Sequence, residues 1–335
     1  MPIGSGLAGF IGVGAEGSYG TYGAATRYPE VHSAKIARKP HYIQGTGLAA
    51  GRFVDPVARH VNTYFDGQGP IEMEFLTTNM GLLLNSIFGA TAVPVQIGAT
   101  AAYTLTCPFG STDGLSLSIQ EVVPDTAGNL HPYTALGCKF VDVEFTAERN
   151  GILMVTLTVD AQDVVETEAV DVFTGSPGQY SFHGGEATLK VGAIGGEVAV
   201  DGVKKWKLKI SRKLATSRIY LGDTVKDEPI TDGVVEITGS FDVDLVNPTV
   251  KAAFADVFNA GTWFSAIMDF VGPQIGASGH ANEIKFATPS ILLTGETPDL
   301  SGPQVVTGTF PFKVDLDVAG DNPLTGTWIS GDTAL

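Results

Sequence analysis

Apolar and polar residues alternate over much of the chain, which is the pattern of β-strands that bury one face. The clearest run is Gly69-Pro-Ile-Glu-Met-Glu-Phe75, where apolar residues and carboxylates take opposite faces. A run of the same chemical type, Gly239-Ser-Phe-Asp-Val-Asp-Leu245, follows at an offset of 170 residues, the difference between 239 and 69. Repetition of one pattern at a fixed offset predicts an internal duplication of a β-rich unit.

Each of these two runs continues into an amphipathic helical pattern. In the first copy we expect Thr77 as the N-cap and Gly89 as the end of the helix. In the second copy we expect Asn247 as the N-cap, Pro248 at the first helical position and Gly261 as the end. The apolar stripes are Met80, Leu83, Leu84, Ile87 and Phe88 in the first copy, and Val250, Ala253, Phe254, Val257 and Phe258 in the second. The sequence therefore predicts one short helix beside the sheet in each copy.

The remaining segments complete two similar β units. Before the repeated run, residues 31–45 correspond loosely to residues 208–222. After it, hairpins are expected at 139–145 with 152–161 and at 291–294 with 305–318, with two more short strands within 103–133. The glycine-rich segment 1–25 is expected to be an extended arm, and 166–180 a linker. We therefore predict two domains, residues 1–175 with the arm and 176–335, each a β-sandwich or open barrel with one flanking helix.

Composition supports a mainly β fold and argues against several classes of function. The 335 residues include 42 Gly, 18 Pro and 44% hydrophobic residues, so the chain can build a core and is typical of a β protein punctuated by glycine. The formal charge of −16 argues against sequence-specific nucleic-acid binding through a basic patch. The sequence shows no secretion signal and no apolar stretch of about 20 residues, so we expect synthesis in a cytoplasm and no membrane insertion.

Residue types that support catalysis or metal binding are scattered along the sequence. Cys107 and Cys138 are too few for a disulfide framework and are expected to be reduced core thiols. The six histidines are dispersed, with no pair two or four residues apart, so no metal site is expected. Gly12-Val-Gly14-Ala-Glu-Gly17 has the spacing of a dinucleotide-binding loop, but no helical pattern follows it. We expect no catalytic residues, no cofactor and no enzymatic activity.

Paired carboxylates are the most informative polar feature. Four pairs lie two residues apart on predicted strands: Glu72 with Glu74, Asp242 with Asp244, Asp142 with Glu144, and Asp315 with Asp317. Four similar pairs in a duplicated chain indicate a repeated acidic surface rather than one catalytic dyad, with a plain solvated sheet face as the alternative. Lys205, Lys207 and Lys209 form a basic row, which we expect to make ion pairs with an acidic neighbouring subunit rather than to bind nucleic acid.

Several stretches share their order and spacing with one known family. They are Gly14-Ala-Glu-Gly-Ser-Tyr-Gly-Thr-Tyr22 with Thr26-Arg-Tyr-Pro-Glu30, the loop Gly47-Leu-Ala-Ala-Gly-Arg52, residues 69–89, residues 145–163, and Gly295-Glu-Thr-Pro298 leading into Gly302-Pro-Gln-Val-Val-Thr307. In these the chain resembles, over nearly its whole length, the tail tube proteins (major tail proteins) of bacteriophages with long, non-contractile tails, the siphoviruses. The resemblance implies a virion tail protein whose β-sandwich carries a flanking helix. It also implies inner sheets that join into a continuous barrel, with rings of six such folds stacked into a tube that conducts DNA.

Two copies of this fold per chain imply a trimeric ring with pseudo-six-fold symmetry. The implied partners are further copies of the chain, the tape-measure, tail terminator and tail tip proteins, and double-stranded DNA that passes without specific binding during genome delivery. The family's channel and the acidic pairs together predict a negatively charged lumen lined first by Glu72, Glu74, Asp242 and Asp244, and second by Asp142, Glu144, Asp315 and Asp317. Ring-to-ring contacts are predicted in the glycine-rich segment 1–25 and in the long loop 46–62, with Arg52, Phe53 and Arg59 as anchors. The alternative interpretation is a tandem β-sandwich carbohydrate-binding or adhesin module.

Overall fold

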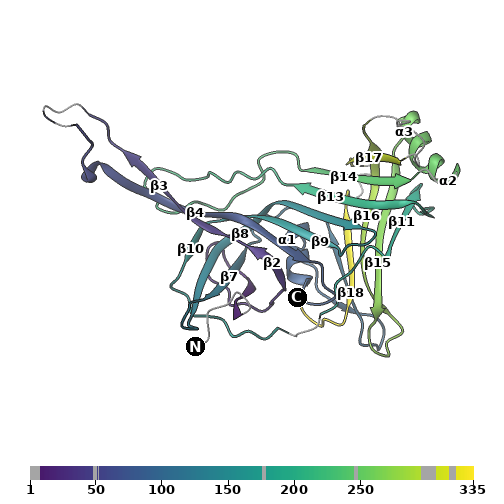
Figure 1. The fold of residues 1–335 in the computed structure, drawn as a ribbon, viewed down its shortest axis with the longest axis horizontal. Coiled ribbons are helices and arrows are strands. Elements are labelled where there is room, and N and C mark those ends of the chain that lie inside the picture. Colours follow the sequence, from purple (N-terminus) through teal and green to yellow (C-terminus); the bar gives the residue numbers. More distant parts are fainter. Residues whose placement is uncertain are drawn as a thin grey trace.

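The computed structural model describes residues 8–47, 51, 53–175, 179–244, 248–295, 307–316 and 322–335. The described chain is mainly β, with antiparallel sheets and a short helical segment in each half (Figure 1). This confirms the expected fold class, a β-sandwich type with flanking helices. The sheet of one chain does not close on itself, so closure into a barrel stays a prediction.

The strands and helices follow one another in a similar order in the two halves. The first half contains β1 (Phe10–Ala15), β2 (Val31–Ala34), β3 (Ala37–Gln44), η2 (Val57–Arg59), β4 (His60–Glu74), α1 (Gly81–Phe88), β5 (Val95–Gln96), β6 (Tyr103–Pro108), β7 (Leu117–Pro124), β8 (Leu130–Glu148), β9 (Met154–Ala161) and β10 (Asp163–Val165). The second half contains β11 (Ala187–Gly192), β12 (Val198–Val200), β13 (Val203–Ser211), β14 (Glu236–Asp244), α2 (Pro248–Lys251), η3 (Ala252–Asp256), α3 (Val257–Ala260), β15 (Phe264–Gln274), β16 (Ala281–Leu293), β17 (Thr307–Val314) and β18 (Thr325–Ser330).

Strand pairing recurs between the halves. In the first half one sheet runs β1–β7–β8–β10 and the other runs β3–β4–β9–β8, so the long strand β8 belongs to both. In the second half the corresponding orders are β11–β15–β16–β18 and β13–β14–β17–β16. The same bulge recurs as well: Leu117 and Ile119 of β7 face Cys138 and Ala135 of β8, and Phe264 and Ala266 of β15 face Ile291 and Thr288 of β16, so the extra residue lies in β8 and in β16.

Two glycines that the sequence repeat aligns have the same environment. A Cβ added to Gly69 would lie 1.6 Å from the Lys35 carbonyl oxygen, and one added to Gly239 would lie 2.2 Å from the Lys207 carbonyl oxygen. Neither position has room for a side chain, because the neighbouring backbone crosses directly over it. The offset of 170 residues therefore aligns positions with the same packing constraint.

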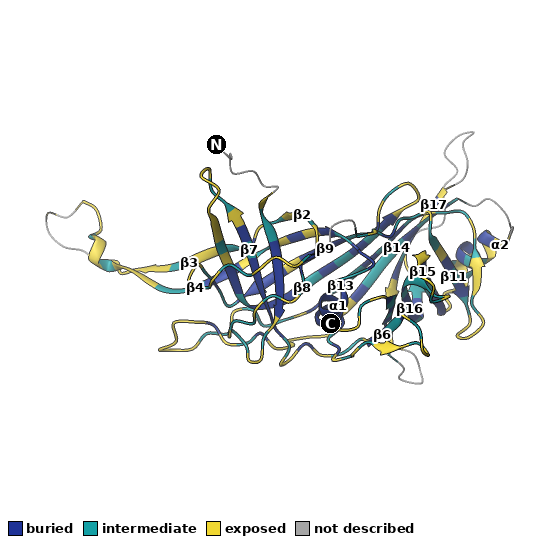
Figure 2. Ribbon diagram, turned by 90° about the horizontal axis from the view of Figure 1, so that it is seen from below, coloured by how far each residue is buried: buried dark blue, intermediate teal, exposed yellow. Residues whose placement is uncertain are grey.

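The two halves share one core and one sheet. β13 pairs with β8 and β18 pairs with β6, so strands of each half extend a sheet of the other. At the junction the rings of Phe145 and Phe286 are 4.7 Å apart and those of Trp206 and Phe286 are 5.3 Å apart. Buried residues follow the sheets across both halves, whereas the hairpin of β3 and β4 projects beyond the body and is mostly exposed (Figure 2).

The helices differ from the sequence prediction at their beginnings. α1 begins at Gly81, its N-cap is Met80 without a side-chain hydrogen bond, and the backbone N–H of Thr77 donates to Tyr180 instead. The prediction of Thr77 as N-cap was therefore wrong, because the segment before α1 pairs with the chain after residue 178. All eight residues of α1 are buried, which is why its apolar pattern exceeds one stripe.

The helical segment of the second half begins at Pro248 as predicted, whereas Asn247 lies outside the described residues. Gly89 and Gly261 end the two segments with φ of 70° and 61°, the left-handed conformation that glycine adopts without strain. The predicted helix ends are therefore confirmed in both halves.

Two other expectations about local structure were wrong. Residues 10–15 form β1, which pairs with β7, so the segment 1–25 is not an unpacked arm from Phe10 onward. Its glycines allow close packing, since a Cβ on Gly14 would lie 2.3 Å from the Gly23 carbonyl oxygen. Similarly, the strand equivalent to β3 is β13, ending at Ser211, and most of 208–222 is a connection. Loose chemical similarity misaligned this segment because β-strand pairing depends on distant partners.

Candidate channel face and assembly surfaces

One face of a continuous sheet carries acidic pairs from both halves. The sheet runs β4–β9–β8–β13–β14–β17 without interruption. Glu72 lies opposite Thr156, Thr156 opposite Glu144, and Glu144 opposite Lys209, and directly opposed residues share a face. The acidic pairs on this face are Glu72 and Glu74 on β4, Asp142 and Glu144 on β8, and Asp242 and Asp244 on β14. We call this surface the polar sheet face.

The lysines of β13 lie on the polar sheet face among these carboxylates. Lys207 Nζ is 2.8 Å from Glu144 Oε1 and Lys209 Nζ is 3.8 Å from Asp142 Oδ1, while Lys205 pairs with Glu148. The expected ion pairs exist, but their partners are on β8 of the same chain rather than on a neighbouring subunit. All of these pairs are partly exposed, so each contributes at most about 1 kcal/mol. The face is therefore mixed in charge where the two halves join.

In the part of the chain that the structure describes, the carboxylates of β4 form no ion pair with a lysine. Glu72 is exposed, and its described hydrogen bond comes from Ser33 Oγ at 3.5 Å. Burial raises the pKa of Glu74, but hydrogen bonds from Ser181 and His32 outweigh it and leave the pKa below its usual value. Glu74 is therefore ionised at neutral pH.

The acidic pair of β14 has a different environment. Asp242 lies opposite Lys205 across β13 and β14, whereas Lys204 Nζ is 2.7 Å from Asp244 Oδ1. Lysines of β13 therefore screen this pair more than the pair on β4. The fourth predicted pair is divided: Asp315 accepts hydrogen bonds from Lys313 and Trp263 beside a groove, and Asp317 lies outside the described residues.

The predicted contact loop is the end of a long hairpin. β3 and β4 pair from Ala37 to Gln44 and extend away from the body, and we call the described residues 40–47, 51 and 53–65 the arm (Figure 1). Phe53 is 99% exposed at its tip, and Arg59 donates to the Gly47 carbonyl oxygen. Arg52 lies outside the described residues. The described tip thus presents an apolar side chain to solvent, and its role in ring contacts stays a prediction.

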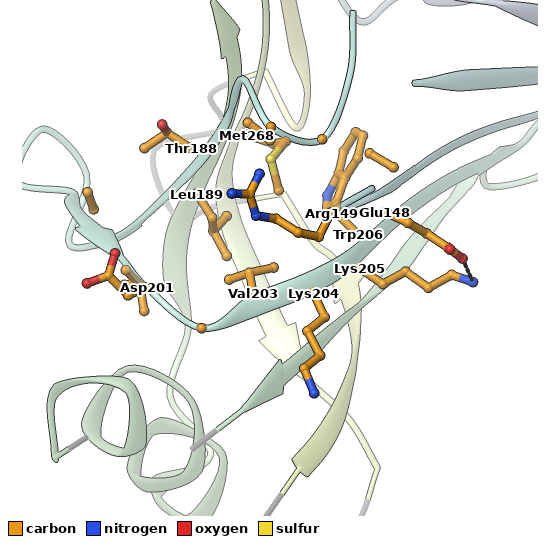
Figure 3. Close-up of a pocket in the computed structure, with 17 residues that line it drawn as sticks. Glu148, Arg149, Thr188, Leu189, Asp201, Val203, Lys204, Lys205, Trp206 and Met268 are labelled. Atoms are coloured by element: carbon orange, nitrogen blue, oxygen red, sulfur yellow. Dashed lines mark hydrogen bonds and ion pairs between the residues drawn. The ribbon is translucent and has the colours of Figure 1, made fainter. Parts of the chain in front are cut away.

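A hollow of about 260 Å³ lies where β8 ends and β13 begins (Figure 3). Arg149 extends over Leu189 and Met268, while Glu148 is held by Lys205 at 2.7 Å and Lys204 points away. Among the described residues, no three His, Cys, Asp or Glu side chains lie close enough to hold a metal ion. No described helix is long and apolar enough to cross a membrane.

Four charged residues are buried between the halves, and the sequence pattern predicted none of these burials. They are Lys139, Asp160, Arg212 and Lys226. Arg212 donates from Nη2 to the Ile87 carbonyl oxygen at 2.8 Å and lies over the Phe109 ring, so a cation neutralises the carboxyl end of α1. Lys139 lies opposite Asp160 on the side of the sheet that also carries Thr158, and it is buried because Glu228 of a distant segment covers it, which no local pattern in the sequence indicates.

Comparison with known proteins places this architecture in one family. The family model described as phage tail tube protein matches residues 6–314. No curated protein matches the chain at a significant level. The match includes both repeated runs, the polar sheet face and the arm. The chain therefore belongs to the phage tail tube protein family.

Proposed function

We propose that three copies of this chain close each ring of a siphovirus tail tube, because each chain supplies the tube fold twice. The observation that carries the proposal is the recurrence of strand order, bulge position and glycine packing between the halves. Membership of the family accounts for a structural role in the virion tail and for self-assembly into a tube. The number of chains per ring is our inference.

The pairing of β8 with β13 inside one chain is our model for how neighbouring chains pair to close a ring. There the second half adds its strand to the free edge of the first half over residues 142–148 and 205–211. β2 and β3 correspond to β13, and in the described part of the chain they pair only with β4. We infer that this edge joins the second half of the next copy in the same way, which removes exposed strand edges and closes a ring by head-to-tail contacts.

The polar sheet face is our candidate for the wall of the channel. A wall of net negative charge repels DNA over the Debye length of about 8 Å, so the DNA slides instead of binding. Glu72, Glu74, Asp242 and Asp244 are the first residues of this wall, followed by Asp142, Glu144, Asp315 and Asp317. Tape-measure, terminator and tip proteins complete the proposed tail, which is assembled in the host cytoplasm.

The stoichiometry can be tested on purified rings. We expect native mass measurement to give three copies of the 35.0 kDa chain, and negative-stain images to show stacked rings with a central hole. Six copies per ring would instead make the second half a decoration outside the tube. A monomer that never assembles would contradict the proposed function.

The channel assignment can be tested by reversing charge. We expect Glu72→Lys combined with Asp242→Lys to slow genome ejection and to make its rate depend more strongly on salt, because the wall then attracts phosphates. Glu166→Lys with Asp256→Lys reverses the same charge away from the polar sheet face and should leave ejection unchanged. Equal ejection by both double variants would refute the assignment.

A further inference from the structure

The connection between β13 and β14 leaves the second half and lies on the first half (Figure 1). Near its tip, Lys226 Nζ is 2.7 Å from Asp160 Oδ1, and both side chains are buried. Glu228 Oε1 is 2.5 Å from Lys139 Nζ. Each half is therefore not complete alone: the first half has a preformed position for a hairpin that comes from the neighbouring fold.

The strand pairing that recurs between the halves identifies the position in the second half that is equivalent to this hairpin-binding position. Phe140 lies opposite Val159, and Leu293 lies opposite Phe312, so both strands are related by a shift of 153 positions, from 140 to 293 and from 159 to 312. The shift takes Lys139 to Leu292, Asp160 to Lys313, Gly137 to Ser290 and Gln162 to Asp315. In the first half this position lies beneath the hairpin, since Gln162 Nε2 donates to the Lys226 carbonyl oxygen at 2.9 Å.

In the second half the equivalent position is an open groove of about 590 Å³. Its lining includes Trp263, Phe264, Pro289, Ser290, Asp315 and Leu316. Trp263 and Leu316 are 58% and 62% exposed, although Trp263 Nε1 donates to Asp315. Large apolar side chains that stay exposed around a groove mark a surface that takes a partner.

The arm is the hairpin that corresponds to residues 212–235. It joins β3 to β4 as that connection joins β13 to β14, but it extends away from its own chain. Its described tip is apolar, since Phe53, Val54 and Val57 are all exposed. β3 and the groove elements β15 and β17 lie at opposite ends of the molecule, so an arm cannot fill the groove of its own chain (Figure 1).

The hairpin tip and the position that binds it both differ in chemistry between the two halves. Charged Lys226 and Glu228 meet Asp160 and Lys139 inside one chain. In the second half Lys313 is already paired with Asp315, and the exposed side chains beside this pair are Trp263 and Leu316, which match the exposed Phe53, Val54 and Val57 of the arm. We propose that the arm tip of one copy docks in the second-half groove of a neighbouring copy within the same ring. This inference rests on the proposed ring. It assigns the arm tip to a contact between neighbouring chains of one ring, instead of the contact between stacked rings predicted from the sequence.

An engineered disulfide between the arm and the groove tests whether the arm tip docks in the groove of a neighbouring chain. Val54→Cys with Leu316→Cys should form a bond between chains on mild oxidation, and the native Cys107 and Cys138 are buried. In a closed ring of three, the largest covalent species is a trimer, whereas bonds between stacked rings give a ladder beyond three chains. Val54→Cys alone should remain uncross-linked. Tubes that assemble without this bond would overturn the inference and leave the proposed function intact.

A charged residue introduced into the arm tip or into the groove tests how much this contact stabilises the ring. Val54→Asp or Leu316→Asp should raise the protein concentration needed for ring formation at least about tenfold, because each places an unpaired carboxylate in an apolar contact. Val54→Lys combined with Leu316→Asp should recover part of that loss. Val123→Asp, at an exposed apolar position outside both surfaces, should assemble normally. Normal assembly of Val54→Asp would contradict the inference, and circular dichroism of the monomers checks that all variants fold.

Discussion

Buried charges fix how the two halves meet. Lys226 and Asp160 form an ion pair with almost no exposure to water, and Lys139 lies beside it with Glu228. Burial raises the pKa of Asp160, and Lys226 only partly opposes that effect. Such a pair adds little net stability, but loss of one partner strands a charge in the interior. Its main effect here is to select one position for the hairpin between β13 and β14.

Removal of the Lys226 ammonium should therefore be costly. We expect Lys226→Met to lower the free energy of unfolding at neutral pH by about 3 kcal/mol, because Asp160 then remains buried and unpaired. An acid whose pKa is raised by folding costs stability above its unfolded pKa, so the deficit should shrink as the pH falls through the raised pKa of Asp160. Urea denaturation of the monomer across pH measures both effects.

The exposed pair Lys251 with Asp256 provides the matched control. Lys251→Met should change the free energy of unfolding by at most about 1 kcal/mol at every pH. A deficit for Lys226→Met that is equally small, or that grows on acidification, would show that the buried pair does not hold the hairpin in place.

At the scale of strands and helices, alternation in the sequence was a reliable guide. The run from Gly69 to Phe75 predicted both β4 and its faces, because only the local period of two decides which side chains share a face. Partners were not predictable in this way. Lys207 was assigned to another subunit, yet it pairs with Glu144 from 63 residues upstream, the difference between 207 and 144. Strand neighbours depend on packing of distant segments, which no local pattern contains.

The repeated glycines give an element-scale prediction. We expect Gly69→Ala and Gly239→Ala each to lower the free energy of unfolding by about 2 kcal/mol, because the new Cβ would collide with a neighbouring backbone carbonyl. Gly17→Ala is the control, since a Cβ there meets nothing within 4 Å. Thermal unfolding followed by circular dichroism is sufficient. If only one of the two glycines were sensitive, the packing equivalence of β4 and β14 would fail.

Over the whole molecule, the proposed ring contains two alternating junctions of different chemistry. The junction inside the chain joins β8 to β13 through lysine–carboxylate pairs and buries the charged tip of a hairpin. In our proposal the junction between chains places the exposed apolar side chains of the arm tip beside those of the groove. The charged junction lies within one covalent chain, so on this proposal the apolar junction is the one that decides whether the chains of a ring stay together.

Rings should therefore respond to temperature more than to salt. Hydrophobic association weakens on cooling, while screening at about 1 M salt reduces the Debye length to about 3 Å and mainly affects charged contacts. We expect sedimentation of dilute rings to show dissociation into monomers in the cold, and little dissociation at high salt. Since the charged junction lies within each chain, neither condition should yield separated halves. Dissociation by salt with no effect of cooling would show that charge complementarity, and not the arm tip in the groove, holds neighbouring chains together.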